Sequence, residues 1–416
     1  MYSLSARVLF LNNPCASPCR AADDHALIFD EQYYVEAARI ILHRHVPQGD
    51  PYHGAPAGYD PNAEHPQLAK LVIASGIEIF GDRPLGWRFG SLLAGSVAIL
   101  AMYALVRAAG GSSWLSLGAS SLLAVDNLVL VQGRIATLDI YALAFMLVGT
   151  VLYLRRHPVA AGVVLGVGVC TKIVGVYAFL SLALIEVLRF LRDRRQADAP
   201  PPRRRADRAR TWALCAVVGA VSYLGLLWLL DATVPPFDPG TGLYYSNPIA
   251  HTLHMLRYGT ALTSPNGPTG IASYPWQWLL DQKPIDYLVT HSRVLGHNHA
   301  SILRTVVDFR GEMNPFIIFL APLGFFASAA AIWRSREEVD LVGVGLIVGT
   351  YLPFVLLSAI LQRTSYIYYM LIVIPGIVLV LARLAARMPR AAIYGWTIGL
   401  AYGFVSLYPF RTLSGH

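Results

Sequence analysis

An adjacent pair of acids, Asp30 and Glu31, is the first group in the sequence that could carry acid–base chemistry. A carboxylate within hydrogen-bond reach of a hydroxyl can take its proton, especially where partial burial raises the pKa of the acid. The pair stands directly before an amphipathic stretch, Gln32 to His45. The alternative is therefore that both acids stabilise the first turn of a helix. We expect Asp30 to act as a general base, with Glu31 orienting it or binding the second reactant.

Basic side chains that could hold an anion stand near the ends of apolar stretches. A fixed positive charge stabilises negative charge that accumulates on a leaving group, and an arginine can bind phosphate through two parallel hydrogen bonds. The alternative is that such side chains only extend toward lipid headgroups. We expect a phosphate to be bound by His65, Arg134 and Arg363, with Lys70, Arg88 and Lys172 lining the same site.

The composition indicates a membrane protein that positions these groups on helices. The 416 residues are 55% hydrophobic and 14% charged, with a mean hydropathy of +0.49. Soluble domains carry about 25% charged residues, so the composition excludes a disordered chain and argues against an ordinary soluble enzyme. A helix needs about 20 apolar residues to cross a bilayer. We therefore expect an all-α polytopic membrane helix bundle with about ten spans: 86–106, 115–132, 138–154, 159–171, 173–191, 211–230, 315–333, 340–361, 366–384 and 391–408.

The arginines predict how these spans are oriented. The segment from Arg189 to Arg210 holds nine arginines and three aspartates, which is +6 of the net charge of +8. Such an excess in one loop marks the cytoplasmic side and gives no support to nucleic-acid binding. Further arginines fall in alternate loops, at 107, 155–156, 334–336 and 383–390. One topology places all of them inside, and it places 12–85, 133–137, Lys172, 231–314, 362–365 and the C-terminus outside.

Two of the outside segments, 12–85 and 231–314, are too long to be simple connectors, and long loops in compact proteins are usually functional. The first holds the amphipathic stretches Gln32 to His45 and Pro66 to Phe80, which we expect to lie along the extracytoplasmic interface. We therefore divide the chain into an N-terminal segment 1–85, a bundle 86–230, a loop 231–314 and C-terminal helices 315–416.

Acids and cysteines near the spans have simpler expected roles. Asp139 lies near a span end, where an acid is costly unless it is paired, so we expect a local ion pair with Arg134. Cys170 and Cys215 lie in apolar runs and should be buried. Cys15 and Cys19 could form a local disulfide in an oxidising compartment. The spacing of cysteines and histidines predicts no metal site.

Short motifs with polar and aromatic residues follow one another along the chain. They are Phe29-Asp30-Glu31-Gln32-Tyr33-Tyr34, Glu64-His65-Pro66-Gln67-Leu68-Ala69-Lys70, Gly86-Trp87-Arg88, Gln132-Gly133-Arg134-Ile135, Trp276-Gln277-Trp278 and Gln362-Arg363-Thr364-Ser365-Tyr366. In this order they resemble the protein O-mannosyltransferase family, over nearly the whole chain from about residue 6. Two positions depart from the family pattern: Gln67 stands where proline is usual, and Gly133 where serine is common.

The resemblance implies an integral-membrane glycosyltransferase that uses a polyprenyl-phosphate sugar. Mannose would pass to a Ser/Thr hydroxyl of a secreted or membrane protein on the extracytoplasmic face of the cell membrane. One displacement without a covalent intermediate inverts the anomeric centre. The sugar carrier would be a substrate, with no protein-bound cofactor, and a role for a divalent ion stays open. Segment 231–314 has no room for the large sugar-binding domain of the eukaryotic members, which suggests a short prokaryotic type.

Aromatic residues near these motifs, Trp276, Trp278 and Tyr366, could stack on a sugar or on the prenyl chain. Tryptophan and tyrosine also concentrate at membrane interfaces, which is the alternative explanation.

Three other functions are compatible with parts of the sequence. The enzyme could transfer another sugar, such as a pentose or an aminosugar, to a lipid or glycan. A transporter or flippase would also have many spans, but it would show paired halves, and we find no internal repeat. A non-catalytic partner subunit would share the fold, although the presence of Asp30 and Arg134 argues against it. The oligomeric state is left open.

The resembling family has a full span before its Asp-Glu motif. Here Ser5 to Leu11 is about two turns of such a run, where about 20 residues are needed, and Asn12-Asn13-Pro14 then breaks it. We therefore expect an in-frame apolar stretch upstream of Met1 in the genome.

Overall fold

The computed structural model describes residues 2–9, 11–12, 25–46, 48–195, 202–295, 301–334 and 337–408. For residues 2–3, 202–205, 289–295 and 301–309 it describes the backbone alone. The suggested disulfide between Cys15 and Cys19 lies outside the described residues.

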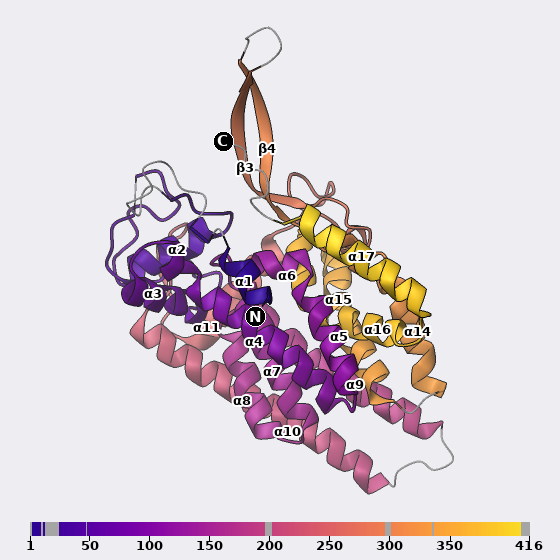
Figure 1. The fold of residues 1–416 in the computed structure, drawn as a ribbon. Helices are drawn as coiled ribbons and strands as arrows, with labels where there is room; N and C mark the ends of the chain where they lie inside the picture. Colours follow the sequence, from indigo (N-terminus) through magenta and orange to yellow (C-terminus); the bar gives the residue numbers. More distant parts are fainter. Residues whose placement is uncertain are drawn as a thin grey trace.

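Helices make up most of the described chain, and the longest of them run side by side as a bundle (Figure 1). In chain order the α-helices are α1 (Tyr2–Val8), α2 (Glu31–Ile41), α3 (Leu68–Phe80), α4 (Pro84–Ala108), α5 (Ser113–Ala124), α6 (Asn127–Gln132), α7 (Asp139–Leu154), α8 (Pro158–Val169), α9 (Tyr177–Arg194), α10 (Pro202–Thr233), α11 (Pro248–Ala261), α12 (Pro275–Trp278), α13 (Pro315–Ile318), α14 (Ala321–Arg334), α15 (Glu338–Leu361), α16 (Ile374–Ala385) and α17 (Arg390–Ser406). Two 3₁₀ helices, η2 (Ile173–Val176) and η3 (Ile367–Ile372), precede α9 and α16.

Five of the described helical segments are long and apolar enough to cross a membrane: 84–108, 173–194, 206–233, 315–334 and 338–361. Three further apolar helices, α7, α8 and α16, are shorter. The multiple apolar helices identify an integral membrane protein. The expected span 115–132 is not one continuous helix, because Asp126 accepts a hydrogen bond from the Val129 amide (3.0 Å) and starts α6 as a separate helix. The expected span 366–384 likewise begins as the 3₁₀ helix η3.

The expectation of an all-α fold is wrong in one respect. Strand β3 (Ile285–Leu295) pairs antiparallel with β4 (Ser301–Gly311), with Ile285 opposite Gly311 and Leu295 opposite Ser301. The hairpin projects away from the helices (Figure 1). Both strands are rich in valine, isoleucine and threonine, whose branched side chains favour extended backbone. A smaller pair, β1 (Phe237–Asp238) with β2 (Leu243–Tyr244), lies in the same long loop.

Both amphipathic stretches of the N-terminal segment are helical, as expected, and form α2 and α3, which pack against each other. Arg39 of α2 binds Asp82, just after α3, through Nε and Nη2 at 3.1 Å each. Gly86 explains how closely α3 approaches α4: a Cβ at this position would lie 2.2 Å from the Gly81 carbonyl oxygen.

The opposite end of the bundle carries the arginines. Arg192 of α9 binds Glu338 of α15 at 3.1 Å, and Arg383 of α16 binds Asp340 of α15 at 2.9 Å. These pairs join three loops that the arginine pattern assigns to one side. Cys170 and Cys215 are buried free thiols, as predicted.

Candidate functional site

Asp30 and Glu31 have different surroundings, although they are adjacent in sequence. Asp30 stands at the N-terminus of α2, but its side chain makes no capping hydrogen bond and is partly exposed. Glu31 is fully buried and accepts hydrogen bonds from the backbone amides of Ile28 and Ala136, both at 2.8 Å. The carboxylate of Glu31 is thus held by backbone amides outside α2, whereas that of Asp30 has no capping role.

Burial raises the pKa of Asp30 to about 7; the positive charge of Lys172 acts to lower it, and the negative charge of Asp139 to raise it. A carboxylate with a pKa near neutrality both accepts a proton well and is available in its charged form at physiological pH.

Lys172 and Asp139 form a buried ion pair whose charges act on Asp30. The Lys172 Nζ donates to Asp139 Oδ2 at 2.7 Å, and both side chains are buried. The expected ion pair between Asp139 and Arg134 is therefore wrong. Asp139 begins α7 and Lys172 precedes η2, and these two elements are in contact. Helix packing brings in a partner that local spacing does not reveal.

Aromatic rings surround this pair and Asp30. Lys172 Nζ lies 5.4 Å from the ring centre of Tyr368 and 5.8 Å from that of Tyr369. Phe29 stacks on Tyr287 at 4.3 Å between ring centres, and the Tyr287 hydroxyl accepts a hydrogen bond from Gln132 Nε2 at 2.9 Å. Sequence reasoning missed Tyr287, which enters the site from the base of β3. The β-branched and aromatic residues in 285–295 are the signal that could place it on a strand.

His65 and Arg363 lie on the cationic side of the site. Burial lowers the pKa of His65 well below its usual value, helped by the charges of Lys172, Lys70 and Arg363. The ring is therefore neutral, and its Nδ1 has no hydrogen-bond partner in the part of the chain that the structure describes. Arg363 donates from Nε to the Gly259 carbonyl at 2.6 Å, and its guanidinium lies 5.6 Å from the ring centre of Tyr369.

The other predicted basic residues make contacts within the chain. Arg88 binds Glu31 through Nε at 2.7 Å and Nη2 at 2.8 Å, which is a buried bidentate ion pair. Arg134 is also buried and donates from Nη2 to the Leu9 carbonyl at 2.7 Å. Lys70 is buried against Asp60 and donates to the His65 carbonyl at 2.9 Å. Lys172 and Arg363 thus share the ring of Tyr369, while Arg88 and Arg134 lie in a second cluster around Glu31 and the first residues of the chain.

Only some of the predicted aromatic residues lie at the centre. Trp278 is buried, donates to Ser273 Oγ at 2.9 Å and meets Tyr369 edge-on at 6.3 Å between ring centres. Tyr366 stacks on Tyr368 at 5.3 Å. Trp276 is exposed and stacks on Tyr274 instead. Among the described residues, no group of three His, Cys, Asp or Glu side chains could hold a metal ion.

The bundle has the fold of membrane glycosyltransferases. It matches a chain of the S. cerevisiae protein O-mannosyltransferase Pmt1–Pmt2 complex bound to the sugar donor, with a TM-score of 0.65 at 12% identity, over 98% of this chain and 89% of that one. It also matches ArnT from Cupriavidus metallidurans bound to undecaprenyl phosphate, with a TM-score of 0.56 at 17% identity, over 96% of this chain and 62% of that one.

Sequence comparison points to one family among these enzymes. Residues 66–198 match the family described as dolichyl-phosphate-mannose-protein mannosyltransferase. The chain is 25% identical to the polyprenol-phosphate-mannose–protein mannosyltransferase of Mycolicibacterium smegmatis, over 91% of this chain and 79% of the relative. It is 24% identical to the enzyme of the same name from Corynebacterium glutamicum, over 85% and 76% of the two chains. The resemblance to the protein O-mannosyltransferases predicted from the motifs is confirmed.

Proposed function

We propose that this protein is a polyprenyl-phosphate-mannose-dependent protein mannosyltransferase that inverts the anomeric centre. The observation that carries the proposal is the placement of Asp30: a carboxyl group with a pKa of about 7 stands beside the charge of Lys172 in a chain similar to these enzymes over most of its length.

In the proposed reaction, a Ser or Thr hydroxyl of the acceptor protein approaches the anomeric carbon of the mannose. Asp30 takes the hydroxyl proton as the new C–O bond forms. The bond between the anomeric carbon and the phosphate oxygen breaks, and its electron pair leaves with the lipid phosphate. The leaving group is already an anion, so it needs positive charge rather than a proton.

That positive charge comes from the cationic side of the site. Lys172 and Arg363 flank Tyr369, and Arg363 has a planar guanidinium that suits a phosphate. The neutral His65 presents Nδ1, to which no described residue is hydrogen-bonded, and would serve as a hydrogen-bonding group for the same phosphate or the sugar. Arg134, in the second cluster around Glu31, stays a candidate for binding the phosphate. Trp278 and Tyr366 would border the sugar or prenyl chain.

We further infer that the protein crosses the cell membrane many times, with its active site on the extracytoplasmic face. Lys172 precedes η2 and α9, whose other end carries Arg192 and Arg194, and Arg363 precedes η3 and α16, whose other end carries Arg383. Arginine-rich ends face the cytoplasm. Segments 1–85 and 231–314 would then form the site together, on the extracytoplasmic side of the two helical parts, 86–230 and 315–416.

The test is transfer by the purified protein in lipid nanodiscs, using radiolabelled polyprenyl-phosphate mannose and a Ser/Thr-rich peptide. We expect label on the peptide with the wild type and none with Asp30→Asn. Transfer only with a different sugar donor, or only to a lipid or glycan, would replace the assigned substrate. Movement of the lipid across the bilayer without transfer would indicate a flippase, and activity only after addition of a partner protein would indicate a subunit.

A further inference from the structure

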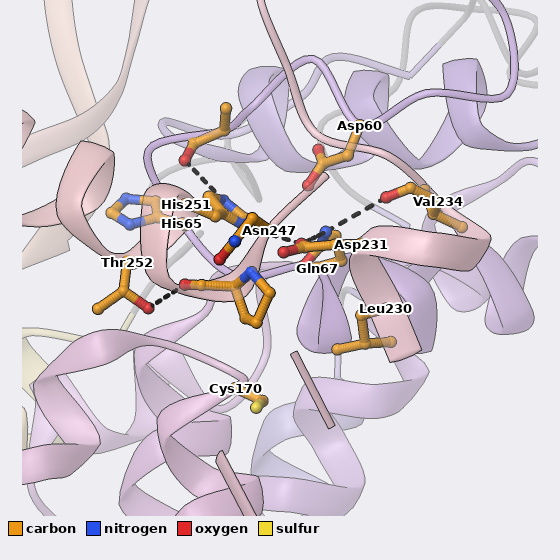
Figure 2. Close-up of polar contacts among 12 residues, drawn as sticks. Asp60, His65, Gln67, Cys170, Leu230, Asp231, Val234, Asn247, His251 and Thr252 are labelled. Atoms are coloured by element: carbon orange, nitrogen blue, oxygen red, sulfur yellow. Dashed lines mark hydrogen bonds and ion pairs between the residues drawn. The ribbon is translucent and has the colours of Figure 1, made fainter. Parts of the chain in front are cut away.

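A buried polar network lies beside the His65 loop, outside the residues that the proposed reaction uses. Asp231, at the end of α10, accepts hydrogen bonds from Gln67 Nε2 and from His251 Nδ1, both at 2.8 Å (Figure 2). All three side chains are fully buried. The network joins the start of α3 to α10 and α11, which are distant from it in sequence.

The two ring nitrogens of His251 both face hydrogen-bond acceptors. Nδ1 faces the Asp231 carboxylate, and Nε2 lies 3.0 Å from the backbone carbonyl oxygen of Ala63. A neutral imidazole can donate from only one nitrogen, whereas the imidazolium donates from both. The contacts are therefore satisfied by a positively charged His251 paired with the carboxylate of Asp231. Such a charge-assisted pair is strong where its remaining donors are also satisfied.

The same loop is also held by Lys70. The Lys70 Nζ is paired with Asp60 and donates to the carbonyls of Asn62 (2.6 Å) and His65 (2.9 Å). The backbone of 62–65 is thus clamped by two buried side chains, Lys70 and His251, each paired with an aspartate. Within this clamp, the side-chain Nδ1 of His65 has no hydrogen-bond partner among the described residues.

Gln67, the departure from the family's usual proline, completes this arrangement. Its amide nitrogen donates to Asp231 and also to the Val234 carbonyl at 3.2 Å. The substituted residue therefore adds contacts to the acid that His251 already binds.

We propose that His251 is a positioning residue: its imidazolium, paired with Asp231, holds the Ala63 carbonyl and thereby sets the place of the His65 ring for the donor. This inference rests on the proposed function, because His65 is taken there as a ligand of the sugar donor. A group held even about 1 Å from its productive place can lose about a hundredfold in rate. The clamp acts through the backbone and touches no reacting atom.

The test is a double-mutant cycle between His251 and His65. His251→Ala should lower kcat for mannosyl transfer about tenfold to a hundredfold, the range set by misplacement. His251→Gln keeps a donor near the Nε2 position and should recover most of this loss. In the His65→Ala background, His251→Ala should cause no further fall. His254→Ala is the matched control on the same helix, since His254 binds the Tyr245 hydroxyl instead, and it should leave kcat near the wild-type value.

Equal losses from His251→Ala with and without His65 would overturn the proposal, because the role would then be general stability. An inactive wild type would refute the proposed function rather than this inference. In that case the same variants are compared by their affinity for undecaprenyl phosphate: His251→Ala should weaken this affinity only where His65 is present, and any other pattern contradicts the positioning role.

Gln67→Pro restores the usual family residue at a backbone φ of −76°, which proline adopts. It removes one contact to Asp231 and should cost less than His251→Ala; a larger loss would show that Gln67, not His251, holds the loop.

Discussion

Lys172 and Asp139 form a buried ion pair, with 2.7 Å between Nζ and Oδ2, across 33 positions of sequence. Burial raises the pKa of Asp30, and the pair modulates it, because the lysine acts to lower this pKa and the aspartate to raise it. It also holds a cation near the rings of Tyr368 and Tyr369 before any ligand binds. Because this cation is already oriented, the site does not have to reorganise when negative charge develops during the reaction.

The first prediction concerns the base. Asp30→Asn keeps the shape of the side chain but removes the proton acceptor, so turnover should fall at least about 100-fold. Binding of undecaprenyl phosphate, measured by fluorescence or thermophoresis, should change little. Turnover near the wild-type rate would exclude Asp30 as the base.

The second prediction concerns pH. The pKa of Asp30 is raised to about 7, so the folded enzyme holds the proton below that pH and the base is blocked. The transfer rate should therefore rise through pH 7 and level off above it. In the unfolded chain the same acid has a pKa of about 3.9, so folding loses stability as the pH rises between these values. The gain in melting temperature from Asp30→Asn should accordingly be larger at pH 8 than at pH 5.

Asp139→Asn is the control for that pH profile. It removes the negative charge that raises the pKa of Asp30 and leaves Lys172, which lowers it. The acid limb should move to lower pH, even if the maximal rate falls. An unchanged limb would assign the titration to another group.

The third prediction separates the outer arginines from one another. Arg363→Ala should weaken donor binding by about 1.5–3 kcal/mol, the value of a hydrogen bond to a charged group. Arg134 is buried against the Leu9 carbonyl, so Arg134→Ala should lower the melting temperature as well as turnover. Arg334→Ala, at the end of α14, is the control and should leave donor affinity, melting temperature and turnover unchanged. Equal, small effects on donor affinity at all three positions would show that none of them binds the phosphate.

The fourth prediction concerns the buried pair between Glu31 and Arg88. Breaking such a pair by removing one partner costs about 3–5 kcal/mol, because a charge stays buried without its counter-ion. Arg88→Ala should therefore reduce the free energy of unfolding by that amount, as measured by denaturant titration in detergent. Arg210→Ala breaks an exposed pair with Asp207 and should cost no more than about 1 kcal/mol. A loss of turnover in Arg88→Ala without a loss of stability would instead make Arg88 part of the donor site.

The residues reveal much of this protein without a structure. Low charge and long apolar runs establish membrane helices, since only such segments can be buried in hydrocarbon. The amphipathic period locates α2 and α3, and the ordered motifs around Asp30, His65 and Arg363 indicate the enzyme family. These features are local, because composition, periodicity and short motifs are written in neighbouring residues. The hairpin of β3 and β4 is equally local, although the composition of 231–314 predicts a loop there.

Tertiary packing alone decided how the candidate residues are paired. Asp139 binds Lys172 rather than the nearby Arg134, Tyr287 reaches Gln132 across 155 positions, and Gln67 meets Asp231 across 164. Each of these contacts depends on which helices and loops lie side by side, and a buried charge or donor takes the partner that packing brings within about 3 Å. For the same reason Asp30 and Glu31, adjacent in sequence, have separate roles: one backbone step turns Glu31 toward Arg88 and leaves Asp30 in the site.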